Sequence, residues 1–89
     1  INTDSGEVNL SGGTVYGATR GIYAPTGAPE IYLTGGSVTS DGYGIYLDHA
    51  DDELHLGESA SVSGQTADVK ISGKGQVFAS FAGQYSAGD

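Results

Sequence analysis

The sequence contains no cysteine, methionine or tryptophan, and it has only two prolines and three basic residues. The absence of cysteine excludes a disulfide framework, a zinc–thiolate site and a cysteine nucleophile. Acidic residues outnumber basic residues 11 to 3, which gives a formal net charge of −8. Nucleic acids and anionic lipids require basic patches, so we expect neither as a partner.

Long apolar runs are also missing. No stretch approaches the ~18 residues that span a membrane, and residues 1–4 do not look like the start of a signal peptide, so we expect no membrane insertion. Because the chain does not begin with methionine, we expect a processed product or a piece of a longer protein. Its 89 residues, 16 of them glycine, are enough for one domain at most, which we place at 1–89.

An internal repeat of 23 residues runs through the chain. The segment VNLSGGTV at 8–15 returns as IYLTGGSV at 31–38. Further copies begin with Leu54 and Val77, again 23 residues apart. A second unit, GIYA at 21–24, returns as GIYL at 44–47 and as DVKI at 68–71, where one extra residue shifts the register. Such a fixed period is typical of solenoid proteins.

Within each repeat, apolar and polar residues alternate as in a half-buried strand. This alternation predicts three short strands per repeat. The first places Asn9, Tyr32 and His55 outward, the second is centred on Val15, Val38 and Val62, and the third places Tyr23, Tyr46 and Lys70 outward. No helical period competes with this pattern.

Three short strands per 23 residues predict an all-β fold, a parallel β-helix of about four rungs in which each rung contacts only its neighbours. The glycine pairs at 12–13 and 35–36 fall where the first strand must turn into the second, since glycine adopts positive φ at little cost. A hexapeptide period, the usual sign of a left-handed coil, is absent, so we expect a right-handed one.

The ends of such a coil expose strand edges that need a cap or a partner. Phe78, Phe81 and Tyr85 lie in the C-terminal segment 72–89. One interpretation is that these rings fold over the last rung as a cap. The alternative is that successive chains stack head to tail, because the repeat phases at the two ends almost match. In that case the partner is a second copy of the chain.

The runs SGGTV at 11–15 and GIY at 21–23, with their counterparts at 34–38 and 42–46, resemble the repeats of bacterial cell-surface β-helix proteins. The resemblance covers roughly residues 1–72. It implies an extracellular or cell-surface location and a structural or adhesive role. Some of these proteins are similar to carbohydrate-binding β-helix modules related to pectate lyases, which implies polysaccharide as a partner and calcium as a ligand in some relatives. None of their site motifs can be placed on this chain.

The densest group of potential ligands is the acidic turn formed by Asp48, Asp51, Asp52 and Glu53. Oxygen-rich loops of this kind suit Ca²⁺, although the spacing does not match an EF-hand loop. The competing interpretation is a solvated turn that keeps the protein soluble. We expect no required cofactor. His49 and His55, on either side of this turn, are expected to lie on the surface without sharing a face.

The outward tyrosines offer a second candidate site. Tyr23 and Tyr46, together with Tyr32 on the first strand, could bind sugar rings by stacking. The same residues also stabilise a sheet by packing on each other, with Lys70 closing the column through a cation–π contact.

No sequence motif indicates a nucleophile or a cleft, and the sole arginine, Arg20, is expected in a corner. We therefore do not expect an enzyme. The sequence therefore predicts an extracellular structural β-solenoid, either fibre-forming by head-to-tail stacking or a spacer in a surface adhesin. A carbohydrate-binding module, with or without calcium, is the alternative.

Overall fold

The computed structural model describes residues 6–24, 30–48, 52–71, 75–81 and 83–88. These residues form eleven short strands and no helix. The first sheet contains β1 (Glu7–Leu10), β4 (Glu30–Leu33), β7 (Glu53–Leu56) and β10 (Gln76–Phe78). The second contains β2 (Thr14–Gly17), β5 (Ser37–Ser40) and β8 (Ser61–Gly64). The third contains β3 (Arg20–Ala24), β6 (Tyr43–Leu47), β9 (Ala67–Ile71) and β11 (Ala87–Gly88).

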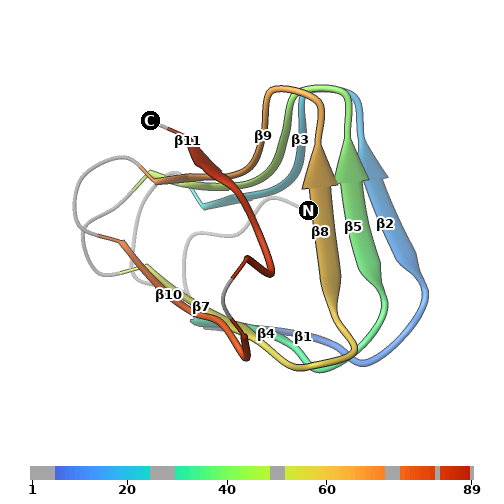
Figure 1. Ribbon diagram of the computed structural model, residues 1–89, viewed down its shortest axis with the longest axis vertical. Helices are drawn as coiled ribbons and strands as arrows, with labels where there is room; N and C mark the ends of the chain where they lie inside the picture. Colours follow the sequence, from blue (N-terminus) through green and yellow to red (C-terminus); the bar gives the residue numbers. More distant parts are fainter. Residues whose placement is uncertain (1–5, 25–29, 49–51, 72–74, 82, 89) are drawn as a thin grey trace.

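Each strand pairs in parallel with the equivalent strand one repeat later, which makes the chain a parallel β-helix. Val8 lies beside Ile31, Ile31 beside Leu54, and Leu54 beside Val77. The predicted 23-residue register is therefore confirmed. In Figure 1 the chain runs counter-clockwise from β1 through β2 to β3, and successive rungs come nearer to the viewer, so the coil is right-handed.

The alternating pattern of the strands fills the interior with aliphatic side chains. In the middle rung, Ile31, Val38, Ile45 and Leu47 are fully buried. Their columns continue into the neighbouring rungs, so that each side chain packs on equivalent side chains above and below. Burial of one such side chain contributes about 1.5–3 kcal/mol, and this apolar core is the main source of stability in a coil without disulfides.

Glycine is required at the corner between the first and second sheets, as the sequence predicts. Gly13 and Gly36, one rung apart, both have positive φ, at 83° and 78°. A Cβ on Gly36 would also lie only 2.7 Å from the carbonyl oxygen of Gly13. The corner therefore depends on glycine both for its backbone conformation and for the close approach of successive rungs.

The fourth rung is incomplete. Strands β10 and β11 extend the first and third sheets, but the described residues between them form no strand beside β8. This segment crosses the end of the coil (Figure 1). Tyr85 packs against the core there, whereas Phe78 points outward from β10 and Phe81 is 54% exposed. The aromatic segment predicted to cover the last rung thus contributes one ring, Tyr85, to the core.

The first rung leaves the other end of the core partly open. Val8, Leu10 and Val15 pack against the core but are only partly buried. Their equivalents one rung later, Ile31, Leu33 and Val38, are at most 1% exposed. Among the described residues, the first rung has a neighbouring rung on one side only.

Candidate functional sites on the outer faces

The outer face of the third sheet gathers three tyrosines and two basic side chains. Tyr23 and Tyr46 lie beside each other in register, with ring centroids 5.2 Å apart in an edge-to-face arrangement. The Tyr43 ring meets the Tyr46 ring edge-on at 5.7 Å. All three side chains are partly exposed. This part of the surface, together with Arg20 and Lys70, is called the third-sheet face below.

Both basic side chains lie over these rings. The guanidinium carbon of Arg20 is 4.0 Å from the centroid of Tyr23, and the Lys70 Nζ is 5.5 Å from that of Tyr46. The predicted cation–π contact of Lys70 is therefore confirmed. Arg20 corrects a prediction, because it is the first residue of β3 rather than part of a corner. Two of the chain's three basic residues thus lie on one face of an acidic protein.

The periodicity used above did not predict that Tyr43 lies on this face, although its spacing from Arg20 indicates it. Arg20 and Tyr43 are 23 residues apart and are register partners. In β6, Gly44 and Ile45 are both buried, so the alternation is interrupted and Tyr43 lies on the same side as Tyr46. A Cβ on Gly44 would lie 2.6 Å from the Val62 Cγ1 atom, which explains why only glycine fits at this interruption.

The outer face of the first sheet carries a stacked aromatic column. The Tyr32 and His55 rings lie 4.6 Å apart and 14° from parallel, and His55 stacks on Phe78 with the same distance and angle. Adjacent strands are ~4.8 Å apart, so the spacing of the strands sets the spacing of the rings. One face of Tyr32 and both faces of His55 are covered in this way, and are therefore closed to a sugar ring.

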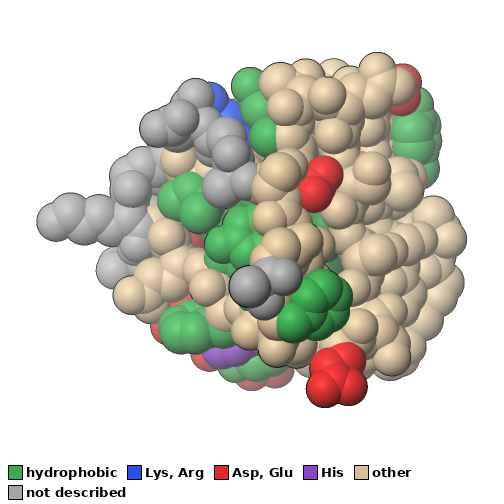
Figure 2. Space-filling view, viewed as in Figure 1, with side chains coloured by type: hydrophobic (Ala, Val, Ile, Leu, Met, Phe, Trp, Pro, Cys, Tyr) green, Lys and Arg blue, Asp and Glu red, His purple; other side chains and the backbone are tan. Residues whose placement is uncertain are grey.

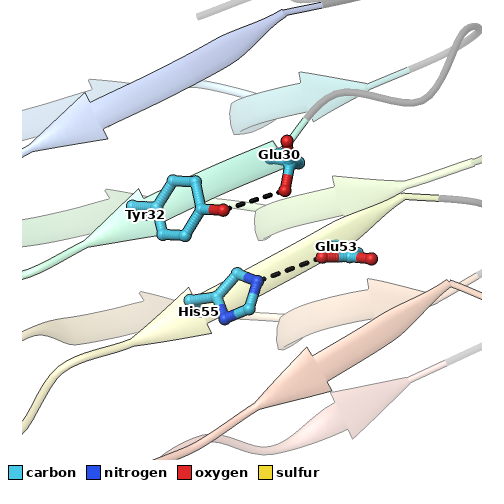
Figure 3. A network of polar contacts seen from close by, with 4 residues as sticks. All are labelled: Glu30, Tyr32, Glu53 and His55. Carbon is cyan, nitrogen blue, oxygen red and sulfur yellow. Dashed lines mark hydrogen bonds and ion pairs between the residues drawn. The ribbon is translucent and has the colours of Figure 1, made fainter.

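A parallel column of glutamates flanks these rings. Glu7, Glu30 and Glu53 are register partners on successive rungs. Tyr32 Oη donates a hydrogen bond to Glu30 at 2.8 Å, and His55 Nε2 lies 3.2 Å from Glu53 (Figure 3). This surface, comprising Glu7, Glu30, Tyr32, Glu53 and His55, is called the first-sheet face below.

The glutamates also change the titration of Tyr32. Its hydrogen bond to Glu30 raises the pKa of the phenol above 10.0, with further contributions from burial and from the negative charges of Glu30, Glu7 and Glu53. A hydrogen bond donated to a carboxylate favours the protonated phenol, and nearby negative charge opposes formation of the phenolate.

The three tyrosines proposed for sugar binding are divided between two faces. Tyr23 and Tyr46 share the third-sheet face, while Tyr32 lies on the first sheet with one ring face against His55. The third-sheet face therefore provides the better candidate for a ligand that stacks on aromatic rings.

The acidic turn is described only in part. His49 and Asp51 lie outside the described residues. Asp52 is fully buried, Glu53 points outward beside His55, and Asp48 follows the end of β6. Among the described residues, no three acidic, histidine or cysteine side chains are arranged so that they could hold a metal ion.

Comparison of the chain with protein-family models, curated proteins and solved structures gave no match. None of the described residues belongs to a helix that is long and apolar enough to cross a membrane.

Proposed function

We propose that the chain is a structural β-solenoid module that extends by stacking its ends on further rungs, in an extracellular or cell-surface setting. The partial exposure of the first rung carries this proposal. Val8, Leu10 and Val15 present a partly exposed layer of the core, and the end of another copy stacked on that side would cover them. The extracellular setting rests on the resemblance to surface β-helix proteins.

The edges at the two ends have compatible chemistry. When β10 of one copy continues into β1 of the next in the same register, Gln76 lies beside Glu7, Val77 beside Val8, and Phe78 beside Asn9. The neutral Gln76 separates Glu53 from the Glu7 of the next copy, which avoids extending a like-charge column. The third sheet continues in the same way from β11 to β3. The second sheet does not, because the described C-terminal residues cross the end of the coil beside β8 (Figure 1) and would contact the first rung of the next copy there.

The backbone of β1 offers a position at which stacking can be blocked. The carbonyl oxygens of Gly6 and Leu10 accept hydrogen bonds from the N–H groups of Glu30, in β4, and Thr34, directly after it. Because successive residues of a strand point to alternate sides, the N–H of Asn9 points away from β4, toward the open edge. Asn9→Pro removes this edge donor without removing a bond to β4, and Asn9→Ala keeps it.

The test is light scattering across a range of protein concentrations, followed by electron microscopy. At about 0.15 M ionic strength, which screens contacts between exposed charges, we expect the wild-type chain and Asn9→Ala to form unbranched filaments. Under the same conditions Asn9→Pro should stay monomeric, with an unchanged circular dichroism spectrum. A wild-type chain that is monomeric at every concentration, or an Asn9→Pro chain that forms the same filaments, would contradict the proposal.

A second candidate function, carbohydrate binding, is favoured by the third-sheet face. Three partly exposed tyrosines and two cations offer groups for hydrogen bonds. A sugar ring can stack there only on those parts of the tyrosine rings that Arg20 and Lys70 do not cover. The test is retention on immobilised polysaccharides of the wild-type chain and of a Tyr23→Ser, Tyr46→Ser variant. Tyr16→Ser, at an exposed tyrosine on the second sheet, is the control. Equal retention of all three proteins would exclude this site.

A further inference from the structure

We propose that the third-sheet face of one copy docks laterally on the first-sheet face of a second copy. The inference rests on the proposed structural role and adds a second direction of assembly, across the solenoid axis. The partner that docks on each face is another copy of this chain. The evidence is the opposite charge of the two faces, whose charged residues lie on the same rungs.

The two faces carry opposite charge. The third-sheet face holds Arg20 and Lys70 over its tyrosines. The first-sheet face holds the column of Glu7, Glu30 and Glu53. In Figure 2, a basic side chain is visible at the upper left, on the side of the third sheet. Acidic side chains and a histidine are visible along the lower edge, on the side of the first sheet.

The charges on the two faces have matching spacing along the solenoid axis. Arg20 belongs to the first rung and Lys70 to the third, since β3, β6 and β9 are successive neighbours. Glu7 and Glu53 also belong to the first and third rungs. Two rungs correspond to ~9.6 Å. Two copies with parallel axes and level rungs therefore bring Arg20 to the height of Glu7 and Lys70 to the height of Glu53.

The faces lie on different sides of the core, with β3, β6 and β9 along the top and β1, β4 and β7 along the bottom of Figure 1. One copy can therefore use both faces at once. A contact between two different faces is heterologous, so it leads to rings or open arrays rather than stopping at a dimer.

The contact is small and charged, which determines how it can be observed. Three rungs cover only ~14 Å along the axis, so each face is well below the ~800 Å² per partner of a standard stable interface. Association is therefore weak. Glu7 is exposed and the other charged groups are partly exposed, so salt screens the attraction and association falls as ionic strength rises.

A charge-swap experiment tests this arrangement. One variant carries Arg20→Glu and Lys70→Glu, and so has two acidic faces. The other carries Glu7→Lys and Glu53→Lys, and so has two basic faces. Both are prepared with Asn9→Pro, which removes end-to-end stacking. A failure of the stacking proposal therefore cannot be mistaken for a failure of lateral docking.

Sedimentation equilibrium at about 0.01 M and about 0.15 M ionic strength provides the measurement. We expect the Asn9→Pro chain to exceed the monomer mass at the lower ionic strength and to lose this excess at the higher. Each swapped variant alone should be monomeric, and their equimolar mixture should again exceed the monomer mass. The Asp41→Lys, Glu58→Lys chain changes two exposed acids elsewhere and matches the net charge of the basic variant. It should associate like its parent.

Three outcomes would overturn the proposal: a monomeric Asn9→Pro chain at both ionic strengths, a mixture of swapped variants that stays monomeric, or a basic variant that associates as well as the charge-matched control. Circular dichroism verifies that each variant is folded. If the double substitution at Glu7 and Glu53 unfolds the chain, Glu7→Lys alone, at an exposed position, replaces it and should weaken association.

Discussion

The side-chain amide nitrogen of Gln84 lies 2.7 Å from the carbonyl oxygen of Gly57, a residue 27 positions earlier in the chain. The same nitrogen lies 3.3 Å from the carbonyl oxygen of Ala60, and Gln84 Oε1 accepts a hydrogen bond from the N–H of Ser80. The Gln84 side chain therefore donates hydrogen bonds to two carbonyl groups at the corner before β8. The described residues of the fourth rung form no strand beside β8. The C-terminal segment is held across the end of the coil by this contact.

Substituting Gln84 should loosen the C-terminal segment. Gln84→Ala removes three hydrogen bonds and leaves backbone groups at the corner without their side-chain partner, so we expect a loss of about 1–2 kcal/mol in the free energy of unfolding. Gln65→Ala, at an exposed glutamine on the corner between β8 and β9, should cost little. Urea unfolding measures both, and equal stability of the two variants would show that Gln84 does not hold the end.

The second position of β3, Gly21, should not accept a side chain. A Cβ on Gly21 would lie 2.5 Å from Val38 Cγ1 and 2.7 Å from the carbonyl oxygen of Gly44. We expect Gly21→Ala to destabilise the fold by about 1–3 kcal/mol through overpacking. Gly12→Ala is the matched control, because no atom lies within 4 Å of its Cβ. Thermal unfolding of the two variants compares them, and similar melting temperatures would contradict the close contact between the second and third sheets.

Tyr32 should titrate at higher pH than an ordinary tyrosine. Its pKa is raised by the hydrogen bond to Glu30, so the folded chain holds the phenol proton more tightly than the unfolded chain. The resulting stability is fully present below pH 10.0 and is lost as the pH rises through the folded pKa.

Glu30→Gln removes the charged acceptor and should lower the pKa of Tyr32. The phenolate absorbance of each protein is measured against pH, and the matching Tyr32→Phe variant is subtracted to isolate the signal of Tyr32. An identical Tyr32 titration with and without the Glu30 carboxylate would show that this hydrogen bond does not form in solution.

Much of the fold follows from the sequence because every rung repeats the same inward positions. The spacing between Val8, Ile31 and Leu54 determines the register, and the alternation within each strand determines which side chains form the core. The outward column of Tyr23, Tyr46 and Lys70 follows from the same periodicity. These features depend on backbone geometry that is common to all rungs.

Two features of the candidate sites depend on local contacts that periodicity does not describe. Arg20 reaches the Tyr23 ring because its long side chain extends along the strand, whereas the period only places its backbone beside Tyr43. The described residues of the fourth rung form no strand beside β8, and the Gln84 side chain contacts the carbonyl oxygens of Gly57 and Ala60 there instead. The Gln84 contact has no counterpart among the described residues of the earlier repeats, whereas the bond from Ser80 Oγ to the Leu56 carbonyl repeats that from Thr34 Oγ1 to the Leu10 carbonyl.

The most direct test of end-to-end stacking is hydrogen exchange of the Asn9 amide at increasing protein concentration. Its N–H points to the open edge of β1, so it exchanges rapidly in the monomer and becomes protected when β10 of another copy pairs with β1. We predict that Asn9 exchange slows as concentration rises, while exchange of amides in the middle rung does not change. Rapid, concentration-independent exchange at Asn9 would show that the end of the solenoid remains open, and would contradict the proposal that the chain is a stacking structural module.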